Sequence, residues 1–425
     1  MAGGVGGGAE PGRGNGCGTG ICWSDAARIN GNSMHSIISL RDFCRSERAW
    51  LVETIESFVR LESPSHDKAA VDRCGTEIAR RIDAIGGRVT RLPQHERGDH
   101  VRAEFGPAEA GHRVLLLGHF DTVWPVGQLA KMPIVERDGC LHGPGIFDMK
   151  AGIAVAMLAT RALLETATAT ATAPANCRLV MLWTTDEEIG SGTSRAMIEE
   201  EARRSDAVLV LEPSLPGGAL KTARKGVGGY ELTIRGVSAH AGIEPQKGAS
   251  AVHELAHQIL RINALQDLDR GMTVNVTQVH GGRTANSIPD EAHAMVDVRA
   301  PTMAAMADVE HAFATLTSVD PRTAIEVRGG FDRPPLERTA GVVRLLQLAK
   351  TVARELGLEI GEGSTGGGSD GNFTAALGVP TLDGLGPAGD GAHALHEHVI
   401  VDALADRAAL VAGLVQSIAE LAPEN

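Results

Sequence analysis

The chain has 425 residues, more than one ordinary hydrophobic core accommodates, so we expect two domains. Apolar residues make up 43% of the sequence and charged residues 22%, the balance of a soluble globular protein. The formal charge of −13 and the 3% aromatic content argue against nucleic-acid binding, because a polyanion would be repelled and rings for base stacking are scarce. No apolar run approaches the ~20 residues of a membrane helix, so we expect no membrane partner.

The first 33 residues are rich in glycine and lack the apolar core of a signal peptide, which predicts a disordered tail and a cytoplasmic protein. The cysteines form no CxxC pair and show no tight disulfide-like spacing, which fits a reducing compartment. They are Cys17, Cys22, Cys44, Cys74, Cys140 and Cys177.

The folded part is predicted to open with two helices, 46–62 and 67–86, followed by a strand at 112–119. This strand is apolar enough to be buried on both faces, and it ends at His119 and Asp121. Side chains two positions apart on a strand point the same way, so the acid can orient the imidazole. A satisfied core histidine is the alternative interpretation of His119.

Asp148 follows a glycine-rich stretch, 143–145, and directly precedes an apolar helical pattern, 149–164. Capping that helix is the simplest role for Asp148. The glycines also let the backbone approach a bound group closely. The Thr-Ala alternation at 166–174 is of low complexity and predicts a surface loop.

The next strand-like run, 178–184, ends in three acidic residues, Asp186, Glu187 and Glu188. Burial and mutual repulsion disfavour their charged forms, so a cation is expected among them. Acidic residues also favour the start of a helix, and a helix is predicted at 193–204, so this second interpretation stays open.

A third buried strand, 206–211, is followed by another carboxylate, Glu212. Strand ends in an α/β sheet converge on one crevice, so His119, Asp148, Glu188, Glu212 and a C-terminal histidine can share a site. Two histidines and three carboxylates suit two zinc-like ions bridged by one carboxylate. Glu187 then remains free as a base, and paired metals ~3.5–4 Å apart suit peptide hydrolysis.

Beyond Gly218 the pattern changes to half-exposed strands and helices in the order βαββαβ, typical of a ferredoxin-like split-βαβ sandwich. We therefore predict a mixed-sheet α/β catalytic domain of residues 34–220 and 337–425, interrupted by an inserted domain of residues 221–336. In the C-terminal segment, helices are expected at 339–356 and 402–421 and a short strand at 379–382.

Seven motifs resemble, in this order, those of the M20 family of dizinc metallopeptidases and amidohydrolases. The motifs are GHFDTVWP, GPGIFDMKAG, TTDEEIGS, VLEP, SAHAG, GGGSD and GLGPAGDGAH. The chain is most similar to the glutamate carboxypeptidase (carboxypeptidase G2-like) branch, and the resemblance runs from about Leu51 to the C-terminus.

The resemblance implies a zinc-peptidase fold in which Asp148 bridges two Zn²⁺ ions, with Co²⁺ or Mn²⁺ as substitutes. It implies that His119 and Glu212 complete the ligand set of one ion and that Glu188 and His393 complete that of the other. His396 and His398 are alternatives, but the resemblance favours His393, whose glycine-rich approach permits it to turn inward.

The resemblance also assigns roles outside the metal ligands. Glu187 would be the general base and Asp121 would orient His119. The inserted domain would be a lid and dimerisation domain, and its His240, in the SAHAG motif, would stabilise the oxyanion from its own chain or across a dimer.

Two further positions, Asn286 and Arg333, match residues that hold the substrate's terminal carboxylate. The planar fork of an arginine suits that task, although solvated surface is the alternative for Arg333. The basic run 221–225 is where this branch places a residue for an acidic substrate side chain, in a register that differs here.

These features predict a homodimeric two-zinc exopeptidase that removes a C-terminal amino acid, such as glutamate, from a small peptide or N-acyl conjugate. An N-acyl-amino-acid amidohydrolase with the same metals is the alternative. A catalytically idle binding module is disfavoured, because every metal and base position carries a competent residue.

Overall fold

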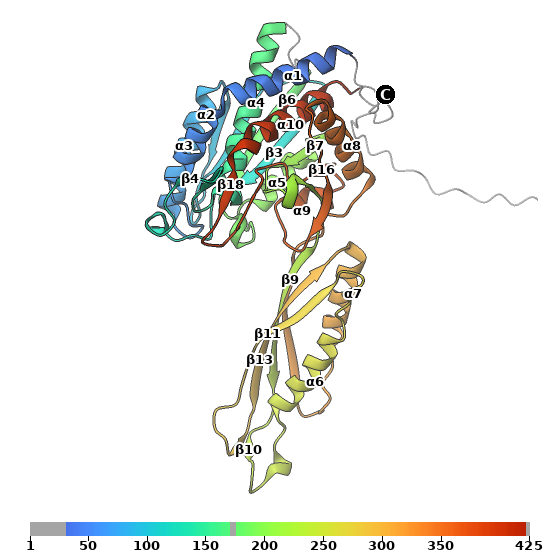
Figure 1. Ribbon diagram of the computed structural model, residues 1–425. Helices are drawn as coiled ribbons and strands as arrows, with labels where there is room; N and C mark the ends of the chain where they lie inside the picture. The colour runs from blue at the N-terminus through green and yellow to red at the C-terminus, as the bar shows by residue number, and fades with distance from the viewer. Residues whose placement is uncertain (1–30, 171–175, 422–425) are drawn as a thin grey trace, which may run out of the picture.

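Figure 1 shows the computed structural model, which describes residues 31–170 and 176–421. Its main body is built around a six-stranded mixed sheet with the order β1–β2–β6–β3–β7–β16. The central strand β3 runs parallel to β6 and β7, whereas β2 is antiparallel to β6. The strands are β1 (Arg88–Leu92), β2 (His100–Phe105), β3 (His112–His119), β6 (Cys177–Thr184), β7 (Ala207–Val210) and β16 (Thr381–Leu382).

Both faces of this sheet are covered by helices, which explains why the central strands read as continuous apolar runs. Along β3, Val114 and Leu116 face the larger core, whereas Leu115 and Leu117 face the smaller one. The larger core is formed with α1 (Gly31–Ser46), α2 (Arg48–Val59), α3 (Lys68–Ala84), α4 (Ala151–Thr170), α8 (Ala340–Glu355) and α10 (Val401–Ala419). The smaller core is formed with α5 (Arg195–Arg203) and α9 (Gly371–Ala376).

Two smaller sheets complete the main body. One has the order β17–β18–β5–β4, and the other is the parallel pair β15–β8. Their strands are β4 (Val135–Arg137), β5 (Cys140–His142), β8 (Leu220–Arg224), β15 (Glu362–Thr365), β17 (Gly389–Asp390) and β18 (His398–Ile400).

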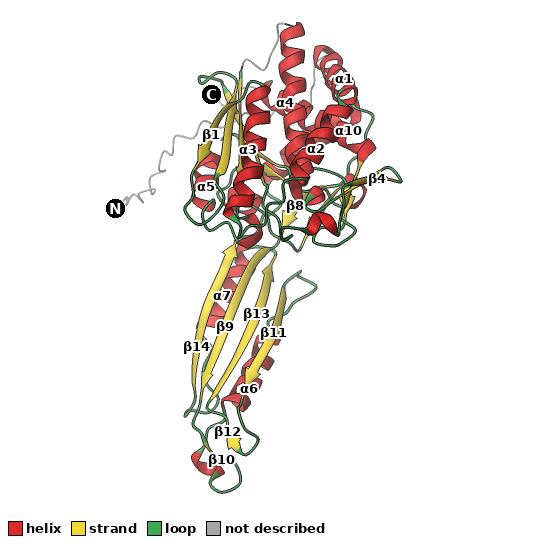
Figure 2. Ribbon diagram, turned by 90° about the vertical axis from the view of Figure 1, so that its left-hand side faces the viewer, coloured by secondary structure: helices red, strands yellow, loops and turns green. Residues whose placement is uncertain are grey.

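The inserted segment forms a four-stranded antiparallel sheet of order β11–β13–β9–β14 with two helices against it and a separate apolar core. Figures 1 and 2 show that it extends away from the main body, with the short strands β10 (Ala239–His240) and β12 (Ser287–Ile288) at its far end. Its elements are β9 (Gly226–Arg235), α6 (Ala251–Asn263), β11 (Thr273–Gly281), β13 (Glu291–Ala300), α7 (Met303–Ala314) and β14 (Ala324–Arg333).

The structure corrects three expectations. Helix α1 begins at Gly31, inside the predicted disordered tail, whose first 30 residues lie outside the described part. Helix α4 continues to Thr170, into the predicted Thr-Ala loop, because alanine favours helix and threonine tolerates it; residues 171–175 of that loop are not described. Residues 221–224, predicted in the insertion, belong to β8, which pairs with β15 of the main body.

None of the helices in the described ranges has the length and apolar character that a bilayer crossing requires. The four cysteines in those ranges, Cys44, Cys74, Cys140 and Cys177, carry free thiols.

Candidate metal centre and active site

Three parallel strands bring their carboxyl ends to one edge of the main sheet. β3 ends at His119, and β6 is followed by the acidic turn that contains Glu187 and Glu188. β7 ends two residues before Glu212. Because β3 lies between β6 and β7, the side chains that follow these strands meet in one place.

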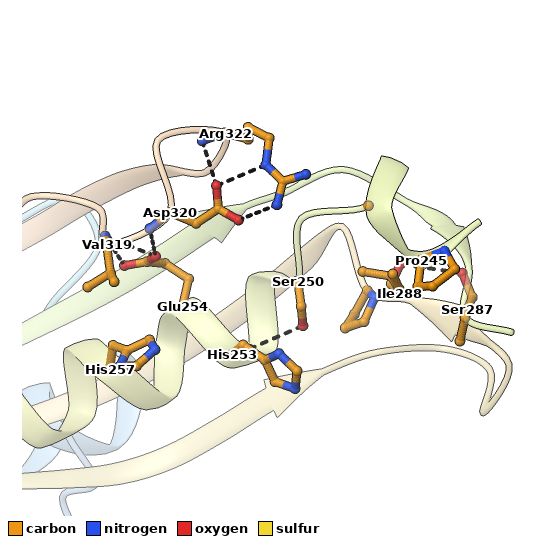
Figure 3. A pocket seen from close by; sticks show the side chains of 13 residues that line it. Pro245, Ser250, His253, Glu254, His257, Ser287, Ile288, Val319, Asp320 and Arg322 are labelled. Carbon is orange, nitrogen blue, oxygen red and sulfur yellow. Dashed lines mark hydrogen bonds and ion pairs between the residues drawn. The ribbon is translucent and has the colours of Figure 1, made fainter. Parts of the chain in front are cut away.

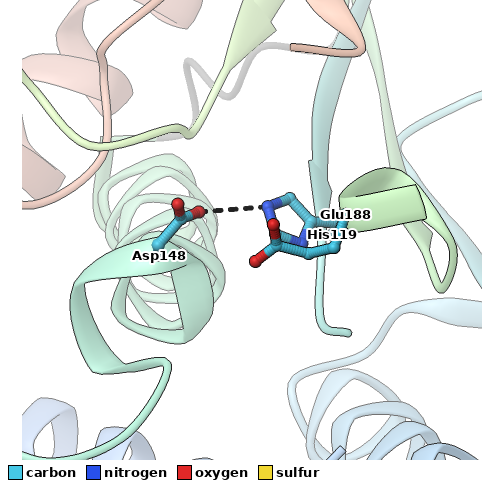
Figure 4. Close-up of side chains that lie close together, drawn as sticks. All are labelled: His119, Asp148 and Glu188. Atoms are coloured by element: carbon cyan, nitrogen blue, oxygen red, sulfur yellow. Dashed lines mark hydrogen bonds and ion pairs between the residues drawn. The ribbon is translucent and has the colours of Figure 1, made fainter. Parts of the chain in front are cut away.

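Asp148 lies between the two predicted histidine ligands. Its Oδ1 atom is 3.2 Å from Nε2 of His119, and its Oδ2 atom is 3.4 Å from Nε2 of His393. Glu212 lies 3.3 Å from His119 and Glu188 lies 3.1 Å from His393. The five residues therefore form two groups that share Asp148, and Figure 4 shows three of them, His119, Asp148 and Glu188, converging.

The donors present fit divalent metal ions. The buried Oε1 atom of Glu188 has no hydrogen-bond partner among the described residues, which leaves it available to a cation. Imidazole nitrogens and carboxylate oxygens are ligands that zinc takes in proteins. These five residues would hold two such ions.

His393 reaches the site because its backbone is left-handed, with φ +61°. This conformation is uncommon for a residue with a side chain and is typical of functional sites. The alternative histidine His398 packs its ring against His142, and its Nδ1 atom lies 2.9 Å from the carbonyl of His396, whose side chain is exposed.

The pKa values of His119, Glu188 and His393 are raised, so these three side chains favour their protonated forms, whereas, despite burial, the two histidines lower the pKa of Asp148. Burial raises the pKa of Glu188 to about 7, and hydrogen bonds to Asp148 and Glu188 raise the pKa of His393 to about 10. Burial would lower the pKa of His119, but the surrounding carboxylates raise it well above 6.5. A metal that binds here must therefore displace protons, so affinity is expected to rise with pH.

Asp121 supports both the histidine and the acidic turn. Its Oδ1 atom is 3.4 Å from Nδ1 of His119, and its two oxygens accept hydrogen bonds from the backbone N–H groups of Glu187 and Glu188. Ser65 donates a further hydrogen bond of 2.7 Å to Oδ2. The nearer partner of His119 Nδ1 is the backbone carbonyl oxygen of Asp121, at 3.1 Å, so Asp121 holds the imidazole through its main chain and the acidic turn through its carboxylate.

Glu187 faces the cluster without contacting it directly. Its Oε2 atom is 4.0 Å from Nε2 of His119, and its Oε1 atom is 3.0 Å from Arg333. Burial raises the pKa of Glu187 well above its usual value, although Arg333 and His119 oppose this shift. A carboxylate with a raised pKa beside a metal cluster is suited to accept and return a proton.

Arg333 lies at the end of β14 and is only 5% exposed, which excludes the solvated-surface interpretation. Its guanidinium donates to Asp370 at 2.8 Å, to the Ser191 hydroxyl at 2.8 Å and to the Glu187 carbonyl at 2.8 Å. Neither Asp370 nor Ser191 was among the predicted site residues, although Asp370 stands in the GGGSD motif.

A pocket of about 390 Å³ opens over this cluster, lined by Asp148, Glu187, Glu188, Glu212 and His393 among others. Lys221 and Arg224 also line it, from the basic run predicted near the substrate. Arg224 is paired with carboxylates, whereas no hydrogen bond or ion pair of the described chain uses the Nζ atom of Lys221. Lys221 thus offers the pocket a buried amine that lacks a partner among the described residues.

A larger pocket, about 670 Å³, lies in the inserted domain, and Figure 3 shows its lining. Its carboxylate Glu254 accepts hydrogen bonds from the backbone N–H groups of Val319 and Asp320. Its histidines, His253 and His257, project from α6 without the carboxylates that surround His119. Because its polar groups form no reactive cluster, we assign the chemistry to the smaller pocket.

Two predicted site residues, His240 and Asn286, are not brought to the cluster. They lie together at the far end of the inserted domain, where the Ala241 N–H donates to the Asn286 carbonyl at 2.9 Å. The Nδ1 atom of His240 accepts hydrogen bonds from the backbone N–H groups of Gly242 and Ile243. In the neutral imidazole the proton is then on Nε2, which can donate a hydrogen bond to a developing oxyanion.

Glu397, which was not among the predicted site residues, holds the loop that carries Asp148. Its carboxylate accepts hydrogen bonds from the backbone N–H groups of Gly145, Phe147 and Asp148 at 2.8–3.1 Å, and from the Trp124 indole at 2.8 Å. The signal available in the sequence is an acid four residues after His393, within the motif-bearing C-terminal segment.

We expect the Glu397→Gln variant to lose metal affinity by about 10- to 100-fold, because its amide N–H₂ group faces backbone donors and the Asp148 loop loses its anchor. Zinc retained after dialysis against a graded series of chelator concentrations measures this effect. His396→Ala, which changes an exposed neighbour, is the matched control and should keep wild-type zinc. Equal zinc retention by both variants would contradict this role for Glu397.

Comparison with known proteins identifies the family to which this geometry belongs. Residues 115–417 match the model of peptidase family M20/M25/M40. The chain belongs to this family. It is therefore an M20 hydrolase, a member of a metal-dependent peptidase family.

Among curated relatives, this M20 chain is 30% identical over 382 residues to carboxypeptidase G2 from Pseudomonas sp. (strain RS-16), covering 88% of the chain and 90% of that relative. It is 29% identical over 358 residues to succinyl-diaminopimelate desuccinylase from Acidovorax ebreus (strain TPSY), covering 77% and 88%. The similarity therefore extends over most of the length of both relatives.

The fold agrees with solved M20-type structures. Aminopeptidase PepT from Bacillus cereus superposes with a TM-score of 0.74 at 24% identity, covering 88% of this chain and 99% of that one. This likeness confirms the α/β fold with its mixed main sheet. The family match confirms the assignment to the M20 family that the seven sequence motifs predicted.

Proposed function

We propose that this M20 hydrolase is a two-zinc exopeptidase that cleaves the amide bond to a C-terminal amino acid, with glutamate as the preferred residue. The observation that carries this proposal is the placement of Asp148, with one oxygen toward His119 and the other toward His393. This placement suits a carboxylate that bridges two ions. When bound, the ions would polarise the scissile carbonyl and acidify a water.

In this proposal His119 and Glu212 would hold one ion, Glu188 and His393 would hold the other, and Asp148 would serve both. Glu187 takes the proton from the attacking water and returns it to the leaving amine. Its distance of 4.0 Å from His119 leaves it beside the centre without being a ligand.

Arg333 is proposed to bind the terminal carboxylate of the substrate. Its guanidinium already contacts Glu187 and is anchored by Asp370. The carboxylate of an incoming substrate can replace the carboxylate of Glu187 on Arg333, while Asp370 keeps the guanidinium in place. Glu187 is then released from Arg333 and available to act as the base. Asn286 is proposed to assist from the inserted domain.

The inserted domain is proposed to act as the lid and as the surface of a homodimer. His240 and Asn286 lie at its far end, so they reach a metal centre only through a large closure or from a second chain. The outer half of β11, an edge strand, is exposed and presents unpaired backbone groups to such a partner.

The deciding experiment is release of free amino acid from N-acyl and dipeptide substrates that end in Glu, Asp, Ala, Leu or Arg, with zinc added and then chelated. We expect chelator-sensitive release with Glu and Asp. Release confined to apolar or basic residues would contradict the glutamate preference and keep the metal chemistry. Release of no residue from any substrate, by a protein with two bound ions, would contradict the exopeptidase assignment.

Lys221 is expected to account for an acidic preference, because it lines the pocket beside the predicted metal ligands and no described residue pairs with its Nζ atom. Lys221→Met should lower kcat/KM for a glutamate substrate by about 10- to 100-fold, from the ~1.5–3 kcal/mol of a hydrogen bond to a charged group. The same variant should have wild-type kcat/KM for a substrate that ends in alanine. Lys225→Met is the matched control, and an equal loss with both substrates would contradict this role.

An N-acyl-amino-acid amidohydrolase is the second candidate, favoured by the 29% identity to a desuccinylase, whose name describes removal of an acyl group. Such an amidohydrolase would use the same site residues but would select its substrate by the acyl group attached to the amino acid. Varying the acyl group at a constant C-terminal glutamate separates the two, because only the amidohydrolase should depend strongly on the acyl group.

A further inference from the structure

The two oxygens of Glu212 face different partners. Oε1 lies 3.3 Å from Nε2 of His119, toward the centre, and Oε2 lies 3.2 Å from the Nη2 atom of Arg224. Glu212 and Arg224 are both buried, and Arg224 ends strand β8 of the main body. The hydrogen bond from Arg224 fixes the orientation of the carboxylate, so Oε1 is the oxygen that Glu212 directs at the centre.

The guanidinium of Arg224 is held in place by hydrogen bonds from all of its N–H groups. Nε and Nη2 donate to Asp383 at 2.8 and 2.9 Å, and Nη1 donates to the carbonyls of Gly367 and Gly368 at 3.2 and 2.9 Å. With the bond to Glu212, all five N–H groups of the guanidinium are used. Ser369 holds Asp383 through a 2.7 Å hydrogen bond, so the anchor of the arginine is also fixed.

We propose that Arg224, anchored by Asp383, is a positioning residue that holds Glu212 as a one-oxygen ligand of the ion shared with His119. This inference rests on the proposed two-metal function and adds a residue to which the sequence motifs gave no such role. A lysine cannot replace it, because a single ammonium group cannot bind both carboxylates and both carbonyls in a fixed plane. Outer-shell partners of this kind typically change metal affinity by about 10- to 100-fold.

A purely structural role predicts something different. Arg224 also ties β8 to the loop at 367–368 and to Asp383, so its loss could lower stability alone. In that case the thermal midpoint of the metal-free protein would fall while the metal affinities stayed at wild-type values. Metal affinity is therefore the readout that separates positioning from structural support.

The test uses the full chain and measures zinc affinity by competition with a chromogenic chelator. Wild type should bind two ions, and Arg224→Lys should bind one ion with wild-type affinity and the other about 10- to 100-fold more weakly. The measurement is repeated in the His393→Ala background, which leaves the ion of His119, Asp148 and Glu212, and the loss should remain. Lys225→Met, a change in the neighbouring cation, is the matched control.

If Arg224→Lys does not fold, Arg224→Gln with Asp383→Asn is the second variant, because it removes both charges of the buried Arg224–Asp383 pair together. Wild-type affinity for both ions in either folded variant overturns the proposal and leaves the proposed function standing. A wild-type chain that binds fewer than two ions overturns the proposed function itself, and the positioning role with it.

Discussion

Replacing Glu187 by glutamine is expected to lower turnover by about 10²- to 10⁴-fold while both zinc ions stay bound. Glutamine has nearly the same shape and can keep a contact with Arg333, but its amide does not accept the proton of the attacking water. Glu187 is 4.0 Å from His119 and contacts no other predicted ligand in the described chain, so its neutralisation removes no metal donor. Turnover and zinc content, measured on the same sample, test this expectation.

The adjacent Glu188→Gln variant provides the contrast. Glu188 lies 3.1 Å from His393 and carries a buried oxygen to which no described residue donates, so it is expected to lose one zinc ion together with activity. The two variants should thus differ in zinc content, although both have low activity. Turnover retained in Glu187→Gln would contradict the base assignment, and zinc lost from it would make Glu187 a ligand.

Two inactive variants are expected to restore each other if His240 acts across a dimer. His240→Ala should lose about 10²- to 10³-fold of turnover, as removal of an oxyanion donor does. In a mixed dimer of Glu187→Gln with His240→Ala, one site combines an intact Glu187 with the intact His240 of the partner. That dimer should regain about half of wild-type turnover, from one repaired site of two.

The mixed dimer is obtained by co-expressing the two variants with different affinity tags and purifying through both. A pair of Glu187→Gln with Glu188→Gln is the control, because both changes affect the same metal centre and neither site is repaired. Activity that stays at the level of the parents would mean that His240 reaches its own centre by closure. Failure to recover any doubly tagged dimer would contradict the proposed dimer.

The sequence by itself determined the elements of the metal centre. His119, Glu188 and Glu212 stand at the ends of apolar runs that are long enough only for buried strands, and such ends converge in an α/β sheet. His393 was preferred over His396 through the family resemblance, and the structure brings it to the cluster with a left-handed backbone. These features are local, so chain order and residue type suffice to predict them.

Only the tertiary structure decided the partners of the charged residues. Glu397 lies about 250 positions from the loop at 145–148 that it anchors, and Arg224 meets Asp383 across 159 positions. Arg333 could be read as solvated surface until its burial against Asp370 and Glu187 was known. Pairing between distant segments depends on how sheets and helices pack, and a single sequence does not encode it as a local pattern.

The same limit applies to helix α1 and to the position of His240. The polar start of α1 resembles the glycine-rich tail before it, and its helix is stabilised by packing of Ile37 and Leu40 against the core rather than by local propensity. His240 was identified from its motif, but its separation from the centre follows from the length of the inserted sheet. The chemical type of each site residue could thus be read from the local sequence, whereas the distance between His240 and the predicted metal centre is set by the folded structure.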